Sequence, residues 1–261
     1  MTKTPESDKS TAGELTIVGH LVELRDRILK CMAALLLVFL SLVYFANDIY
    51  AFVATPLTSV LPPDTSMIAI DPTSPFFAPF KLTFYAALFI CAPYILYQLW
   101  AFIAPGLYSN EKAMAVPLFI SSVLLFYAGI AFAYYFLFGF VFSFFISVAP
   151  EGIAVAPDIS SYLSFVLKIF FAFGFVFEIP IAVFLLIWSG MVEVESLEGK
   201  RPYVIVGCFV VGMLLTPPDP FTQTIMAVPM WMLYEVGVYA GKRFIKKKQA
   251  EEQQESAKPQ A

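Results

Sequence analysis

Charge and histidine are scarce in this sequence, and their scarcity excludes most kinds of enzyme. His20 is the only histidine, so the chain lacks the second histidine of a zinc metalloprotease helix, and a catalytic serine would have only this imidazole as its base. No glycine-rich phosphate-binding loop follows a strand pattern. The three cysteines lie in apolar runs without metal-binding spacing. We therefore expect neither enzymatic activity nor a bound metal or cofactor.

Apolar residues take the place of the missing charge. Hydrophobic residues make up 59% of the chain and charged residues 14%, whereas soluble domains average about 45–50% and 25%. The apolar runs are too long for the core helices of a soluble protein and long enough to cross a bilayer. The composition predicts an all-α polytopic membrane protein with the lipid bilayer as a partner and no nucleic-acid partner.

Six apolar segments, bounded by charges, prolines or polar clusters, mark the expected transmembrane helices. They are Ile28–Phe45, Leu82–Ile103, Pro117–Ser147, Tyr162–Trp188, Pro202–Thr216 and Phe221–Tyr234. At about 1.5 Å per residue, the third and fourth exceed the hydrocarbon core of about 30 Å and must tilt or project beyond it. The last two, about 22 and 21 Å long, are too short to span comfortably. The turn TPPDP joins them into a hairpin.

The basic residues predict the orientation. With six spans, both termini lie on one side, and of the 16 Lys and Arg all except Lys81 and Lys168 fall on that side. The positive-inside rule therefore places both termini in the cytoplasm. Residues 1–27 are polar and carry no signal-peptide pattern. We expect a six-helix domain over residues 14–245, between disordered cytoplasmic tails at 1–13 and 246–261.

The outside loop at residues 46–80 is unusually apolar for a loop. Its first part has the spacing of an amphipathic helix, with Ile49, Phe52, Val53, Leu57 and Val60 on its apolar side. The proline-broken stretch SPFFAPF follows. We expect this loop to lie on the membrane surface or to cap the bundle.

Glu23 precedes the first span in the stretch GHLVELRDRILK, which is expected at the membrane interface. An ion pair with Arg27, four residues later, is a sufficient structural reason for this acid. Asp26 and Lys30 have the same spacing and could pair likewise.

Two other acids fall at expected helix starts. Glu111 lies in the first turn of the third helix, where Ser109 or Asn110 can cap it and the helix dipole favours an acid. Asp219 can cap the sixth helix, because Pro220 suits the first helical position. A structural role and a functional one remain compatible at both positions.

Glu178 is the only charge in the stretch AFGFVFEIPIAVFLL. An acid in the membrane costs roughly 2.5–3.5 kcal/mol on insertion scales, so it needs a reason to exist. Two residues later, Pro180 removes an N–H and leaves the carbonyl of Val176 without its helical partner. The acid and the freed carbonyl predict a hydrated polar site inside the membrane. Pairing with another span is the alternative.

Four motifs in chain order resemble those of the TatC family, the six-span core subunit of the twin-arginine protein translocase. They are HLVELRDR, LYQLWAFIAPGLYSNEK, FEIP and KRPYVIVGCFVVGMLLTPPDPFTQ, within a resemblance that covers roughly residues 16–245. The resemblance implies binding of the twin-arginine signal peptides of folded precursors and proton-gradient-driven export. It also implies single-span TatA and TatB partners, a hetero-oligomer with several copies, and location in the bacterial cytoplasmic (inner) membrane.

The same resemblance implies roles for individual residues. The signal-peptide site would comprise Glu23, Glu111, Arg25 and Phe102. Glu178 would be the intramembrane polar site, and the periplasmic cap and hairpin would contain Pro56, Phe76 and Asp219. Partner helices would dock near Met213, Thr216 and Gln223. The chain departs from the family after Glu111, where Lys112 is followed by Ala113 instead of a longer basic run.

A proton-coupled secondary transporter with Glu178 as its relay is the alternative function. Such transporters usually show two halves with matched span lengths. Here the expected spans run short, medium, long, long, short and short, without a mirrored pair of broken helices. The pattern therefore favours the translocase.

Overall fold

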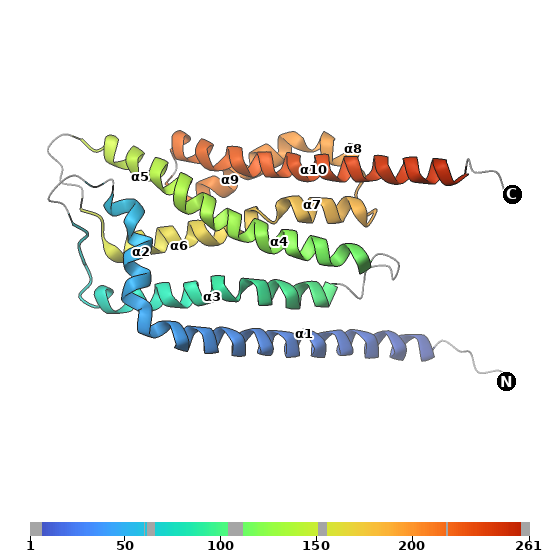
Figure 1. The fold of residues 1–261 in the computed structure, drawn as a ribbon, viewed down its shortest axis with the longest axis horizontal. Helices are drawn as coiled ribbons and strands as arrows, with labels where there is room; N and C mark the ends of the chain where they lie inside the picture. The colour runs from blue at the N-terminus through green and yellow to red at the C-terminus, as the bar shows by residue number, and fades with distance from the viewer. Residues whose placement is uncertain are drawn as a thin grey trace.

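A computed structural model describes residues 7–59, 61, 66–103, 112–150, 156–217 and 219–256. In these ranges the chain is helical apart from short turns and one isolated backbone bridge between Ile68 and Asp158. Figure 1 shows the long helices side by side along one axis, with the start of α1 and the end of α10 at the same end of the bundle. The expected all-α architecture is confirmed for this part of the chain.

The six apolar segments predicted from the sequence lie in helices, apart from the turn at Phe177 and Glu178 and the last residue, Thr216. In chain order the helices are α1 (Ser7–Leu42), α2 (Ala46–Thr58), α3 (Ser74–Ile103), α4 (Lys112–Phe132), α5 (Phe138–Ser147), α6 (Ile159–Val176), α7 (Ile179–Trp188), α8 (Val194–Gly199), α9 (Arg201–Leu215) and α10 (Pro220–Ser256). A 3-10 turn, η1 (Val43–Phe45), joins α1 to α2, and a π-helical turn, η4 (Ala133–Leu137), joins α4 to α5. Among the described residues, four helical stretches are long and apolar enough to cross a membrane: Gly19–Thr58, Ser74–Phe102, Val116–Ser147 and Ile159–Trp188.

The last two spans differ from each other in helix length. α9 has 15 residues, or about 22 Å, as the sequence predicted. α10 has 37 residues, because good helix formers such as Lys, Ala, Glu and Gln continue the helix beyond its apolar part. α1 likewise begins at Ser7. Both helices thus extend into the ranges predicted as tails, and residues 1–6 and 257–261 lie outside the described part of the chain.

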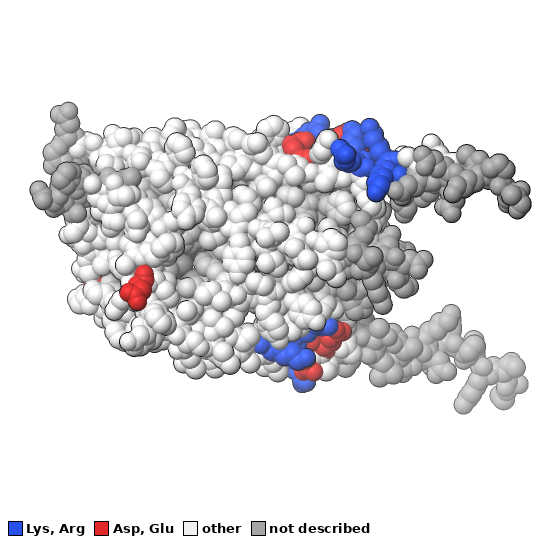
Figure 2. All heavy atoms as spheres, in the orientation of Figure 1, with Lys and Arg blue, Asp and Glu red and all other residues white. Residues whose placement is uncertain are grey.

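Charged side chains gather at one end of the molecule. Figure 2 shows two clusters of Lys, Arg, Asp and Glu near the end where α1 begins and α10 ends, with almost no charge across the middle of this face. Large apolar side chains are exposed along the helices, among them Leu37, Leu40, Phe136, Phe140 and Leu214. Apolar exposure on this scale suits a bilayer better than water.

α2 crosses the end of the bundle opposite to the two charged clusters (Figure 1). Its Val53 and Leu57 are buried in the main apolar core. The Tyr162 hydroxyl of α6 donates a hydrogen bond to the Val53 carbonyl at 2.9 Å. The predicted helix is confirmed over Ala46–Thr58 and caps the bundle, but Phe52 of its predicted apolar side is 59% exposed and Val60 lies outside the described residues.

Asp158 fastens the loop before α3 to the start of α6. Its Oδ2 accepts a hydrogen bond from the Ser161 N–H at 2.9 Å, and its Oδ1 accepts one from the Ile70 N–H at 3.2 Å. These two N–H groups lower the pKa of Asp158. The Ile159 N–H also donates to the Ile68 carbonyl at 2.9 Å. The same residue thus caps a helix and closes the end of the bundle.

Two glycines let α10 pack closely against α7. A Cβ atom on Gly237 would lie 2.9 Å from the Cα of Pro180, and one on Gly241 would clash with Ile187. Small residues four positions apart are the spacing that allows transmembrane helices to approach each other. The close approach positions α10 against the helix that follows Glu178.

We predict that Gly237→Ala destabilises the protein by about 1–3 kcal/mol, because the added methyl group overlaps the backbone of Pro180. Gly207→Ala in α9 is the matched control, since no atom lies within 4 Å of its added Cβ. Alanine favours a helix by about 1 kcal/mol over glycine, so the control keeps or raises the unfolding midpoint. Thermal unfolding in detergent, followed by circular dichroism, measures both. Equal midpoints for the two variants would contradict the close packing.

Candidate functional site

Glu23 lies on α1 at the charged end of the bundle. Its Oε1 accepts hydrogen bonds from Arg27, at 3.0 Å from Nε and 2.6 Å from Nη2, which confirms the predicted ion pair. Its Oε2 lies 3.7 Å from Nδ1 of His20. The Glu23 side chain is 37% exposed. A carboxylate has about four lone-pair sites, so Glu23 can accept further hydrogen bonds from outside the protein.

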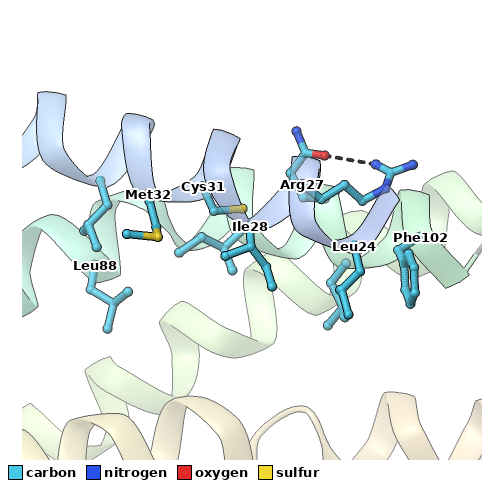
Figure 3. Close-up of a pocket in the computed structure, with 11 residues that line it drawn as sticks. Leu24, Arg27, Ile28, Cys31, Met32, Leu88 and Phe102 are labelled. Atoms are coloured by element: carbon cyan, nitrogen blue, oxygen red, sulfur yellow. Dashed lines mark hydrogen bonds between the residues drawn. The ribbon is translucent and has the colours of Figure 1, made fainter. Parts of the chain in front are cut away.

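Arg27 connects this carboxylate to α3. Its Nη1 donates to Oε1 of Gln98 at 2.9 Å, and its Nη2 donates to the carbonyl of Ala101 at 3.1 Å. Figure 3 shows Arg27 with a dashed hydrogen bond to a neighbouring side chain. Gln98 is buried and donates in turn to the hydroxyl of Tyr94 at 2.9 Å. The chain of hydrogen bonds holds Glu23 in place from a second helix.

Asp26 pairs with Arg25, so the predicted pair between Asp26 and Lys30 is wrong. The Arg25 Nη2 lies 2.8 Å from Oδ1 of Asp26. Both side chains are exposed. Arg25 is next to Asp26 in the sequence, so its guanidinium reaches the carboxylate, whereas Lys30 is one helical turn away. Arg25, assigned to the signal-peptide site by resemblance, thus makes its hydrogen bonds with Asp26 rather than with Glu23.

An apolar groove of about 290 Å³ lies beside Glu23, between α1 and α3. Its walls include Leu24, Ile28, Met32, Leu88 and Phe102, whose side chains Figure 3 shows around the opening. Phe102 stacks on the ring of His20 with centroids 4.3 Å apart. Phe102 is therefore linked to Glu23 through His20, and Arg27, the ion-pair partner of Glu23, also lines the groove.

Two residues of this site were missed in the sequence. His20 is three residues before Glu23, and this helical spacing was the available signal. Gln98 comes from another helix, and no local pattern connects it to Arg27. Glu111 lies outside the described residues, together with Ser109 and Asn110. Its convergence with Glu23 stays a prediction.

Glu178 lies where the fourth span breaks. α6 ends at Val176, α7 begins at Ile179, and Pro180 occupies the first turn of α7. The Glu178 Oε2 accepts a hydrogen bond from the Ser122 hydroxyl of α4 at 2.5 Å. Its Oε1 is buried and has no hydrogen-bond partner among the described residues. Glu178 thus forms a hydrogen bond with another span through one carboxylate oxygen and has the other oxygen buried without a partner among the described residues.

The hairpin between α9 and α10 contains four of the predicted residues. Asp219 caps α10, because its Oδ1 accepts from the Thr222 N–H at 2.7 Å and its Oδ2 accepts from the Thr222 hydroxyl. Thr216 is buried and donates to the Gly212 carbonyl at 3.0 Å. Gln223 is half-buried and lies within van der Waals reach of a Cβ placed on Gly212. Met213 is exposed on α9.

Pro56 and Phe76 lie at the opposite end of the molecule from Glu23. Pro56 is half-buried inside α2, the helix that caps the bundle. Phe76 is exposed in the first turn of α3 and contacts Phe77 and Phe80, with ring centroids 5.1 and 4.9 Å apart. These positions belong to the cap and do not contact the groove.

Comparison with known proteins identifies this architecture. The family model described as Sec-independent protein translocase protein (TatC) matches residues 19–229. The chain belongs to the TatC family. It is 56% identical to the Sec-independent protein translocase protein TatC of Azotobacter chroococcum mcd 1, over 93% of this chain and 94% of that relative. The corresponding protein of Escherichia coli strain K12 is 53% identical, over 88% and 90%.

Solved TatC structures share the fold. A crystal structure of the twin arginine translocase receptor TatC matches with a TM-score of 0.76 at 37% identity, covering 85% of this chain and 98% of that one. The resemblance to TatC and the six-span membrane fold are therefore confirmed. The alternative of a proton-coupled transporter is not supported.

For this TatC-family chain we predict that Glu178→Gln is tolerated better in protein export than Glu178→Leu. Glutamine keeps an oxygen that accepts from Ser122 and can still hold water, whereas leucine leaves that hydroxyl without its partner. Export of a folded reporter through the membrane measures the difference. Equal export by the leucine and glutamine variants would reject a polar role for this position.

Proposed function

We propose that this chain is the receptor and core subunit of the twin-arginine translocase in a bacterial cytoplasmic (inner) membrane, with both termini in the cytoplasm. It binds the twin-arginine signal peptides of folded precursor proteins. With TatA and TatB it forms a hetero-oligomer of several copies that exports these precursors by means of the proton gradient. Membership of a translocase family and the helical bundle with an apolar girdle support this proposal.

One observation carries the proposal: the Glu23 carboxylate, which is 37% exposed, pairs with Arg27, and Arg27 lines an apolar groove. Signal peptides present a positively charged segment followed by an apolar one, and Glu23 and the groove offer the matching order of surfaces. An arginine guanidinium can bind a carboxylate through two parallel hydrogen bonds, which explains a preference for arginine over lysine. Glu111 is the second acid of the proposed site.

Arg27 orients the Glu23 carboxylate and still leaves it able to accept further hydrogen bonds. When a guanidinium from a signal peptide binds Glu23, Arg27 keeps its hydrogen bonds to Gln98 and to the Ala101 carbonyl. Arg27 therefore stays in place, and the carboxylate can share its lone pairs between two arginines. The free site is preorganised by this arrangement.

The hairpin of α9 and α10 is the proposed docking region for the single-span partners. α9 is too short to cross a bilayer of normal thickness, so the lipid beside it must become thinner. Met213 is exposed to that lipid, while Thr216 and Gln223 place polar groups at the same hairpin. A partner helix with a polar residue at this depth would find hydrogen-bonding groups there.

We predict that Glu23→Gln sharply reduces binding of a twin-arginine precursor while the protein still folds. The variant keeps an amide oxygen for Arg27 but removes the charge that a guanidinium recognises, which is worth about 1.5–3 kcal/mol for a charge-assisted hydrogen bond. Binding of a twin-arginine peptide to the detergent-solubilised protein measures the effect.

Asp26→Asn is the matched control for this experiment. It removes the same charge three residues away, from an exposed acid whose ion pair is with Arg25. We expect the control to bind the peptide nearly as the unaltered protein does. Normal binding by Glu23→Gln, or an equal loss of binding in Asp26→Asn, would contradict a specific role of the Glu23 carboxylate in peptide binding.

A further inference from the structure

A cavity of about 410 Å³ that is lined mostly by charged residues lies at the same end of the molecule as Glu23 but on other helices. Its walls come from α8, the first turn of α9 and the later turns of α10, and Figure 2 shows this cluster of charges over α8 and α10. The charged residues that line it are Glu198, Arg201, Glu235, Lys242, Arg243 and Lys246. None of them contributes to the site described above.

Both acids of this cavity are neutralised within it. Glu235 accepts two hydrogen bonds from Arg201, at 2.7 and 2.9 Å. Glu198 accepts one from Lys242 at 2.9 Å and lies 3.8 Å from Arg201. The hydrogen bond from Lys242 lowers the pKa of Glu198, so this carboxylate stays ionised and its cation stays in place. The ion pairs join α8, α9 and α10 into one rigid wall.

Two cations remain in excess. Arg243 and Lys246 line the same cavity, are exposed, and form no ion pair or hydrogen bond with the residues that the structure describes. Four cations thus face two carboxylates, and the cavity carries a surplus of positive charge. Such a surplus in a pocket at a membrane edge attracts a phosphate group.

The outward face of α10 continues from these cations into an apolar stripe. Met232, Val236 and Tyr239 are 58%, 55% and 65% exposed. Together with Arg243 and Lys246 they follow the spacing i, i+4, i+7, i+11 and i+14, which places all five on one side of the helix. A molecule lying along this stripe would meet apolar side chains first and cations at its end.

We propose that this cavity binds the headgroup of one anionic phospholipid, whose acyl chains lie along Met232, Val236 and Tyr239. Arg243 and Lys246 bind the phosphate, the guanidinium through paired hydrogen bonds and the ammonium as a point charge. The apolar stripe selects a lipid over free phosphate, because only a lipid fills both parts of the site. The bound lipid fastens the corner formed by α8, α9 and α10 to the charged surface of the membrane.

Native mass spectrometry of the full chain in a neutral detergent tests the proposal, with phosphatidylglycerol and phosphatidylcholine of identical acyl chains as probes. We expect preferential retention of one phosphatidylglycerol. In Arg243→Gln/Lys246→Gln its apparent affinity falls by about tenfold to thirtyfold, whereas phosphatidylcholine binding is unchanged. Circular dichroism verifies that the variant is folded.

Lys30→Gln/Lys200→Gln is the matched control, because it removes two exposed cations that do not line the cavity. We expect it to keep the affinity for phosphatidylglycerol within about threefold. An equal loss in both double variants would overturn the site in favour of general surface attraction. Displacement of the lipid by inorganic phosphate at matched concentration would also overturn it, as would equal retention of the two lipids by the unaltered protein.

Discussion

A bilayer interior offers no hydrogen-bond partner to a backbone N–H or carbonyl, and the whole architecture follows from this constraint. The described spans are helical, and the break in the fourth span is packed against another helix. The turn between α6 and α7 lies against Ser122 and Gly129 of α4. The π-helical turn η4 has two residues, Ala133 and Leu137, buried in the protein. Other residues of η4, Tyr135 and Phe136, are exposed, and a π-helical turn can lie there because its backbone hydrogen bonds stay within the segment.

Buried polar side chains need hydrogen-bond partners within the protein for the same reason. Glu23 is held through Arg27 and Gln98, and the charged wall beside α8 is held by ion pairs between Arg201, Glu235 and Glu198. Both arrangements lie at the end of the bundle where α1 begins and α10 ends (Figure 1). Glu178 is different, because one of its oxygens has a partner and the other has none in the described part of the chain. The acids at the charged end are therefore paired, whereas Glu178 keeps one carboxylate oxygen without a hydrogen-bond partner among the described residues.

Local sequence patterns predicted much of this structure. Apolar run length indicated the spans, apolar residues at helical spacing indicated α2, and Asp219 before Pro220 indicated the cap of α10. The spacing of Glu23 and Arg27 indicated their ion pair. These features all depend on residues within a few turns of each other, and so a single sequence contains the signal.

Contacts between distant segments could not be predicted in this way. Ser122 and Glu178 are 56 positions apart, and Arg27 and Gln98 are 71 positions apart. The groove beside Glu23 forms only when α1 packs on α3, and the cationic cavity only when α10 packs on α8. Asp26 shows the limit at short range, because a flexible exposed arginine next to it displaced the expected helical partner.

In the proposed function, the Glu23 carboxylate binds an arginine of the signal peptide directly. A double-mutant cycle tests it, with Glu23→Gln in the protein and the first arginine of the pair replaced by glutamine in the peptide. Direct contact predicts a coupling of about 1.5–3 kcal/mol between the two changes, because either substitution alone already removes the interaction. Losses that add within about 0.5 kcal/mol would contradict direct contact and would assign Glu23 to the support of α1 alone.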